Sequence, residues 1–163
     1  MVDASSPLVQ EVLQGRHVAC LATENADGII HMVAVWYLFD GRHFYIATSS
    51  RSAKARNLRA RPQASLMVDV RHTVAARGVT ASGSVQILTG DASKKWNDRI
   101  HRRYLSAAAL ADARVGPVFA QWDDITIQLK PERYVAWDMR EADKAAFGGS
   151  FASHPDYLLP LEP

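Results

Sequence analysis

Residues 43–70, HFYIATSSRSAKARNLRARPQASLMVDV, divide into an apolar stretch, a basic stretch and a second apolar stretch. The opening HFYIAT is rich in aromatic and β-branched residues, which favour a strand. Residues 51–61 are good helix formers, with Ser49 or Ser50 as the N-cap, and Pro62 prevents the helix from continuing. The closing QASLMVDV predicts another strand. The pattern therefore predicts a strand, a short basic helix and a strand.

Two further strands are predicted upstream of this segment. HVACLAT at 17–23 is short and apolar, and IIHMVAVWYLF at 29–39 is longer. Turns at NADG (25–28) and Asp40-Gly41 join them to each other and to HFYIAT, which indicates an antiparallel meander of three strands. A short helix is predicted before them, between Pro7 and Gly15.

The downstream half continues the mainly β pattern. Residues 79–88 and 133–137 predict strands, 124–129 alternate strictly, and Gly83 marks a bulge or a close backbone approach. Residues 91–113 predict a helix in two pieces, with Asp91 as the cap. The residues 140–163 contain Gly148-Gly149 and prolines, and are predicted to form an irregular C-terminal arm.

These elements predict a mainly β single domain over residues 1–163. Six or seven mostly antiparallel strands with flanking helices favour a small β-barrel. A glycine-rich βαβ fingerprint is not present in the sequence. The chain has no apolar run of about 18 residues and no secretory-type start, so a membrane span is not expected. Its single cysteine, Cys20, fits a reducing cytoplasm.

Positive charge is concentrated in the middle of the chain, although the net charge is only +2. Of the fourteen residues 49–62, five are basic and none is acidic. One interpretation is a solvated helix face. The other is an anion site, because basic residues at a helix start oppose the helix dipole unless an anion is bound there. Hydroxyl, backbone N–H and cationic groups at this helix start fit a phosphate or carboxylate. They come from Thr48, Ser49, Ser50, Arg51 and Lys54.

Nucleic acid and metal ions are weaker candidates for this chain. Nucleic-acid binding would favour aromatic residues interleaved with the charge, whereas the aromatic residues near this segment lie in apolar strands. The six histidines form no HExxH pattern, and no cysteine or carboxylate set has metal-ligand spacing. No nucleophile–base–acid grouping is visible, so no catalytic residue is assigned.

The order of these segments resembles the flavin/deazaflavin split-barrel superfamily, the pyridoxamine 5′-phosphate oxidase-like proteins. The resemblance rests on ACLAT, a DG turn, VAVWYLFDGRHFYIAT and KARNLRARPQASLMVD, followed by GVTASGSVQIL, PERYVAWDMR and FGGS. The most telling part is K-x-R-N-L-x-x-x-P ahead of an apolar strand. The chain is most similar to the branch that often binds the deazaflavin coenzyme F-420.

The resemblance implies a split β-barrel of Greek-key type that forms a homodimer, with two cofactor sites at the subunit interface. Coenzyme F-420 is the favoured cofactor and FMN the alternative. The cofactor phosphate would be held by Thr48, Ser49, Ser50, Arg51 and Lys54, and Arg56 and Arg59 would contact an oligoglutamate tail. Asn57 belongs to the same motif. The strand that would line the ring contributes His31, Val33, Ala34 and Trp36.

The resemblance implies an oxidoreductase that transfers a hydride between the cofactor and a small organic substrate at the dimer interface. The sequence departs from the pattern of the true pyridoxamine-phosphate oxidases at two places, so oxidation of vitamin B6 is not expected. Ser52 stands where the true oxidases carry a second basic residue, and the C-terminus has no matching arginine-containing segment. A flavin carrier or sensor without turnover, and a haem-binding relative on the same barrel, remain alternatives. The sequence does not name the substrate.

Overall fold

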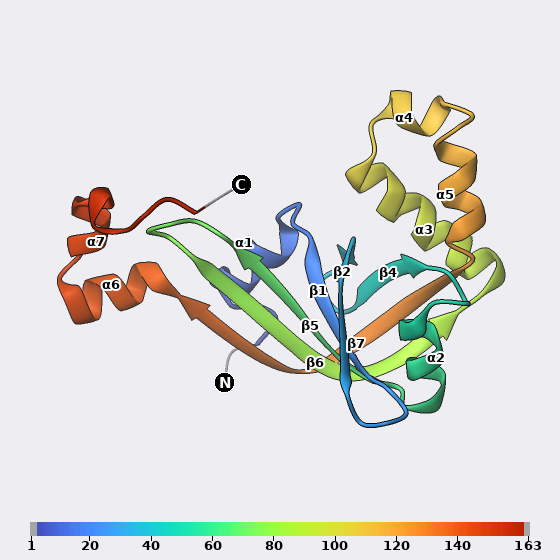
Figure 1. Ribbon diagram of the computed structural model, residues 1–163, viewed down its shortest axis with the longest axis horizontal. Coiled ribbons are helices and arrows are strands. Elements are labelled where there is room, and N and C mark those ends of the chain that lie inside the picture. Colours follow the sequence, from blue (N-terminus) through green and yellow to red (C-terminus); the bar gives the residue numbers. More distant parts are fainter. Residues whose placement is uncertain (1–2, 162–163) are drawn as a thin grey trace.

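Seven strands form one antiparallel sheet in the computed structural model, which describes residues 3–161 (Figure 1). Along the sheet the order is β2-β1-β5-β6-β7-β4-β3. This confirms the mainly β class and the antiparallel pairing predicted from the sequence. The strands are β1 Ala19–Glu24, β2 Ile30–Val35, β3 Leu38–Phe39, β4 Phe44–Thr48, β5 Gln63–Val70, β6 Arg77–Leu88 and β7 Ile125–Asp138.

The predicted long strand at 29–39 is two strands at opposite edges of the sheet. β2 pairs with β1, whereas β3 pairs with β4, so the predicted meander of three strands is wrong. Only Trp36 and Tyr37 separate β2 from β3, and three residue steps span at most about 10 Å. The two edges therefore meet at this point, and the sheet rolls into the barrel that the sequence predicts.

The last strand, β7, is continuous where the sequence predicts two. It pairs with β6 over the whole length of that strand, and the register shifts at Gly83. Ser82 faces Arg133 and Gly83 faces Pro131, so Glu132 is an extra residue on β7. A Cβ at position 83 would overlap the carbonyl oxygen of Lys130. Both the bulge and the close backbone approach predicted at Gly83 are confirmed.

Helices cover the ends of the sheet more extensively than the sequence predicts. The helix of the basic segment is capped by Ser52, whose hydroxyl accepts from the Ala55 N–H, and not by Ser49 or Ser50. No helix within residues 3–161 has the length and apolar character needed to cross a membrane. The helices are α1 Pro7–Gln14, α2 Ala53–Ala60, α3 Gly90–Tyr104, α4 Ala107–Ala111, α5 Gly116–Trp122, α6 Met139–Phe147, α7 Ser150–Ser153 and the 3₁₀ turn Pro155–Tyr157.

We call α3, α4 and α5 together the helical cover, residues 90–122. It leaves the sheet after β6 and returns at β7, and it lies at the opposite end of the molecule from α6 and α7 (Figure 1). The predicted cap of its first helix, Asp91, lies inside α3, and Thr89 precedes that helix. Helix α5 was not predicted, because Gly116 and Pro117 indicate a loop unless the proline stands in a first helical turn.

The core lies between the inner face of the rolled sheet and α1. Tyr37 and Phe44 are fully buried there, and the Tyr37 hydroxyl shares its proton between the carbonyls of Leu13 and Gly15 at 3.0 and 3.1 Å. This contact ties the end of α1 to the crossing between β2 and β3. Other fully buried side chains of the same core are Val9, Val12, Leu13, Leu21, Ile46, Leu66, Ile127 and Leu129.

The C-terminal arm is helical over most of residues 140–157, which corrects the irregular structure predicted for it, and residues 162–163 of that prediction lie outside the described residues. The Asp138 carboxylate caps α6 by accepting from the Arg140 N–H, and Gly148 ends the helix with a left-handed φ of 62°. Buried Asp143 accepts from the N–H groups of Phe151 and Ala152 and so fixes α7 against α6. The glycines and prolines separate short helices here and do not abolish them.

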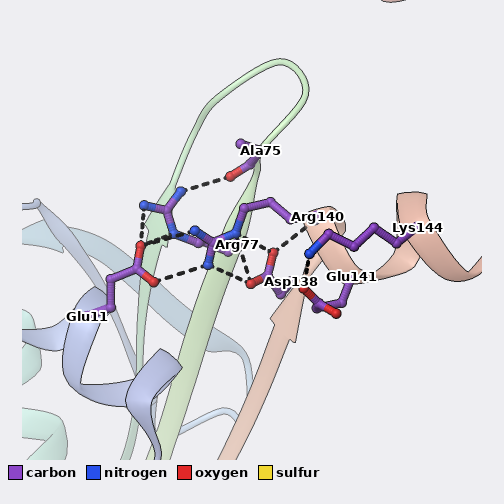
Figure 2. A network of polar contacts seen from close by, with 7 residues as sticks. All are labelled: Glu11, Ala75, Arg77, Asp138, Arg140, Glu141 and Lys144. Atoms are coloured by element: carbon purple, nitrogen blue, oxygen red, sulfur yellow. Dashed lines mark hydrogen bonds and ion pairs between the residues drawn. The ribbon is translucent and has the colours of Figure 1, made fainter. Parts of the chain in front are cut away.

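A network of charged side chains fixes the start of α6 against the barrel (Figure 2). Glu11 on α1 pairs with Arg77 on β6 at 2.6 Å and with Arg140 on α6 at 3.1 Å. Arg140 also pairs with Asp138 at 2.6 Å. Hydrogen bonds from Arg140 are the main reason that the pKa values of Glu11 and Asp138 lie below the ordinary carboxyl range.

This network predicts acid lability of the folded protein. The pKa values of Glu11 and Asp138 are lower in the folded than in the unfolded protein, so their ionised forms stabilise the fold. This contribution to the free energy of unfolding is fully present above the unfolded carboxyl pKa of about 4, and it is lost as the pH falls through the folded pKa values. Urea unfolding between pH 7 and pH 3 should show a shallower pH dependence for Glu11→Gln than for wild type. The control Glu141→Gln, which affects only an exposed pair with Lys144, should behave as wild type. Equal slopes for all three proteins would contradict the prediction.

Candidate functional site

A cavity of about 330 Å³ opens where β2, β4, α2 and the helical cover meet, and we call it the inner cavity. It lies beside the point where the two sheet edges approach each other, since Val35 and Trp36 are part of its wall. Its volume falls at the lower end of the range for small-molecule sites. The lining residues are Val18, Ala34, Val35, Trp36, Ala47, Thr48, Lys54, Ile100, Phe119 and Asp123.

One wall of the inner cavity is aromatic and rigid. Trp36 stacks on Tyr104 of α3 with ring centres 5.0 Å apart and planes 1° apart. It also stacks on Phe119 of α5 at 5.4 Å. Trp36 and Phe119 line the cavity together with the apolar Val18 and Ala34, and this surface suits a flat aromatic ligand.

The polar wall of the inner cavity comes from the end of β4 and the start of α2. Thr48 is buried and lies within 3.4 Å of the Ser52 hydroxyl. Lys54 stands in the first turn of α2, and burial lowers the pKa of its ammonium group, with the nearby Asp123 acting in the opposite direction. A partly desolvated cation beside a hydroxyl is a suitable pair of donors for a phosphate.

Asp123 joins this wall to the helical cover. Its carboxylate lies 2.8 Å from Nε2 of the buried His101, and its carbonyl accepts from the Asn97 side-chain amide at 2.6 Å. A second hollow of about 240 Å³ lies behind it among α3, α4 and α5, and Asp123 and His101 form part of its wall. Asp123 is therefore held in place by α3 while its side chain borders the inner cavity.

The loop before α2 presents its donors to the neighbouring Asp124. The Ser50 N–H and the Ser50 hydroxyl each donate to the Asp124 carboxylate at 2.6 Å. Both hydrogen bonds lower the pKa of Asp124 below its ordinary value, and the bond from the Ser50 hydroxyl has the larger effect. A further pocket of about 400 Å³ lies outside this pair and is lined by Ser49, Arg51, Gln121, Trp122 and Asp124. We call it the outer pocket.

The residues predicted to hold a phosphate thus fall into two adjacent places. Thr48 and Lys54 line the inner cavity, whereas Ser49 and Arg51 line the outer pocket. Ser50 stands between them, bonded to Asp124. Arg51 precedes the Ser52 cap and so is outside the first helical turn, which corrects its predicted position. Of the residues predicted to line the ring, Ala34 and Trp36 border the inner cavity.

The remaining predicted site residues lie elsewhere. His31 and Val33 are on β2, paired with Thr23 and Leu21, and Val33 packs against the core. Asn57 is buried and donates to Thr23 and Asn25, so it attaches α2 to β1 and the turn after it.

Arg56 and Arg59, predicted to meet an acidic tail, are exposed at the surface of α2. Their guanidinium groups donate to the carbonyls of Arg51 and Ser50. They therefore brace the loop before α2 from the solvent side.

Sequence reasoning missed Phe119 on α5, and Asp123 and Asp124, which connect α5 to β7. They reach the site because β7 pairs with β4, with Ile125 opposite Thr48. Asp123 and Asp124 were visible in the sequence as two acidic residues directly before a strand. Their position beside Thr48 depends on the pairing of β7 with β4, which the sequence does not show. Within residues 3–161, no three His, Cys, Asp or Glu side chains are grouped as metal ligands.

Comparison with known proteins gives a family and a set of related structures. Residues 5–138 match the family described as pyridoxamine 5′-phosphate oxidase. No match is found among curated proteins. A conserved hypothetical protein from Mycobacterium tuberculosis is 25% identical, with a TM-score of 0.70 over 87% of this chain and 88% of that chain.

Two further solved structures carry ligand names. An F-420 reductase is 21% identical, with a TM-score of 0.64 over 77% of this chain and 94% of that chain. A FAD-binding protein from Mesorhizobium loti is 19% identical, with a TM-score of 0.60 over 79% of this chain and 91% of that chain. At these identities the two structures support the fold alone.

Proposed function

Since the chain belongs to the pyridoxamine 5′-phosphate oxidase family, whose members bind flavins or deazaflavins, we propose that it is an oxidoreductase that uses coenzyme F-420. In this proposal a hydride passes between the cofactor and a small organic substrate. FMN is the alternative cofactor, because the two share a ribityl phosphate.

The observation that carries the proposal is the inner cavity itself. An aromatic and apolar wall faces a polar wall whose cation, Lys54, is partly withdrawn from water. That combination fits a flat ring joined to a phosphate, and it fits neither a purely apolar ligand nor a simple anion. Trp36, which stacks on both Tyr104 and Phe119, would help to fix the plane of the ring.

The protein's own contribution would be binding, orientation and exclusion of water. The bound deazaflavin or flavin supplies the hydride chemistry. Lys54 and Thr48 would hold the phosphate, and Ala34, Trp36 and Phe119 would border the ring. Ile100 and Val18 would keep the reacting face dry, which favours hydride transfer over side reactions.

A second copy of the chain would complete the site. Val18 lines the inner cavity but is half exposed, and the nearby β2 leaves Ile30 and Met32 more than half exposed. Apolar side chains at the rim of a binding cavity suit a dimer interface. Light scattering of the purified protein should give twice the chain mass of 18.0 kDa, and a monomer at micromolar concentration would remove this part of the proposal. A cytoplasmic location is also proposed, on the basis of the lone free Cys20.

The proposal is tested by equilibrium titration of the purified protein with coenzyme F-420 and with FMN, following cofactor fluorescence. Saturable binding of F-420 that is at least tenfold tighter than that of FMN supports the deazaflavin assignment, and the reverse order selects FMN. Binding of neither cofactor would overturn the function. A carrier without turnover would bind the cofactor but leave its reduced form stable in the presence of candidate oxidised substrates.

A further inference from the structure

We propose that Asp124 is a built-in competitor for the anion site, so that a ligand phosphate binds the Ser50 loop only by displacing this carboxylate. The inference concerns the same site as the proposed function and rests on it.

The contact between Ser50 and Asp124 has the chemistry of an anion site. Ser50 offers its backbone N–H and its hydroxyl to a single carboxylate, at 2.6 Å for both pairs of atoms. Two converging donors of this kind are what a phosphate oxygen requires at such a loop. Asp124 therefore occupies donors that an external anion would otherwise use.

Hydroxyl and cationic side chains lie on both sides of this contact. Thr48 and Lys54 lie on one side of it, in the inner cavity, and Arg51 lies on the other side, in the outer pocket. Arg59 donates to the Ser50 carbonyl at 2.8 Å, so the loop is supported from behind and does not depend on Asp124 alone for its shape. Removal of the carboxylate would leave the donors in place and free.

The Asp124 side chain can leave this contact without exposing any part of the core. The side chain is exposed to solvent, and its backbone begins the segment that enters β7. A rotation of this side chain into the outer pocket exchanges one set of hydrogen bonds for water and breaks no core contact. The apparent affinity for phosphate therefore equals the intrinsic affinity multiplied by the fraction of molecules in which the Ser50 donors are free.

The experiment compares wild type, Asp124→Asn and Asp124→Ala by titration with inorganic phosphate, FMN and coenzyme F-420. Both variants should bind the phosphate-bearing cofactor about five- to twentyfold more tightly than wild type, with Ala equal to or stronger than Asn. Inorganic phosphate should follow the same order, which separates an effect on the phosphate from one on the ring. The matched control Asp91→Asn removes an equal charge from a fully exposed side chain and should change affinity less than twofold.

A double-mutant cycle with Ser50→Ala separates competition from general repulsion between charges. Competition requires that the gain from Asp124→Asn shrink at least threefold when the Ser50 hydroxyl is absent, whereas repulsion would leave the gain unchanged. The Ser50 amide resonance, followed by NMR, should respond to phosphate at lower concentration in Asp124→Asn than in wild type. Circular dichroism confirms that each variant is folded.

Two outcomes overturn the inference. If Asp124→Asn and Asp124→Ala bind cofactor as wild type does or more weakly, Asp124 positions the loop and does not compete. If the gain is independent of Ser50, the effect is electrostatic only. In both cases wild-type binding still supports the proposed function, whereas binding of no cofactor by wild type or by either variant overturns both.

Discussion

Lys54→Ala is expected to weaken binding of the cofactor by roughly 10- to 150-fold, or about 1.5–3 kcal/mol, the loss expected for one charge-assisted contact. The large effect follows from burial. Lys54 lines the inner cavity, and desolvation already lowers its pKa, so its attraction for a phosphate is screened less than that of a surface lysine. Fluorescence titration with F-420 or FMN measures the change.

Two variants give this prediction its controls. Lys54→Arg keeps the charge and should recover part of the affinity. Arg61→Ala removes an equal charge from the far end of the same helix, where the guanidinium binds the Glu24 carbonyl, and should change affinity less than threefold. If Lys54→Ala binds within twofold of wild type, the basic segment is a solvated helix face and the phosphate lies elsewhere.

Tyr37→Ala is expected to lower the free energy of unfolding by about 3–5 kcal/mol, a large share of the roughly 5–15 kcal/mol typical of a domain. The ring is fully buried at the crossing between β2 and β3, and packs near Phe44 at 6.0 Å. Its removal leaves a cavity where the sheet edges meet. The carbonyls of Leu13 and Gly15 also lose the hydroxyl that they share.

Urea unfolding of a paired set of variants tests this expectation. Tyr37→Phe keeps the ring and removes only the hydroxyl, so it should cost about 1–2 kcal/mol. Tyr157→Ala, in the exposed end of the arm, should stay within about 0.5 kcal/mol of wild type. A loss below 1 kcal/mol for Tyr37→Ala would mean that the crossing relaxes around the gap, and that the barrel does not depend on this residue.

The fold was predictable where local signals decide it. Pro62 and the apolar pattern after it placed β5 at Gln63–Val70, as observed, and Gly83 marked the bulge. The break at Trp36 was not predictable, because an unbroken apolar run does not reveal that its two halves pair with different neighbours. The seven strands agree in number only because that split is balanced by the joining of two predicted strands in β7.

The residues of the candidate site also divide into those that the sequence predicted and those that it did not. Charge and residue type identified Thr48 and Lys54, and the resemblance identified Ala34 and Trp36. Phe119, Asp123 and Asp124 stayed hidden because their place is set by the pairing of β7 with β4, nearly 80 residues apart in sequence. Asn57 was assigned to the cofactor because it belongs to the basic motif, yet its buried amide serves the attachment of α2 to β1.

The helical cover begins and ends at residues that are already neighbours, since Leu88 and Thr126 face each other in the ladder between β6 and β7. A segment of different sequence inserted between these two positions is therefore expected to leave the pairing of β6 with β7 intact, and we call the replaceable segment a cassette. The phosphate-binding wall comes from β4 and α2, whereas Ile100, Phe119 and Asp123 come from the cassette or its exit. Grafting a different cassette between these two positions offers a way to change the substrate while the grip on the cofactor's phosphate end is retained.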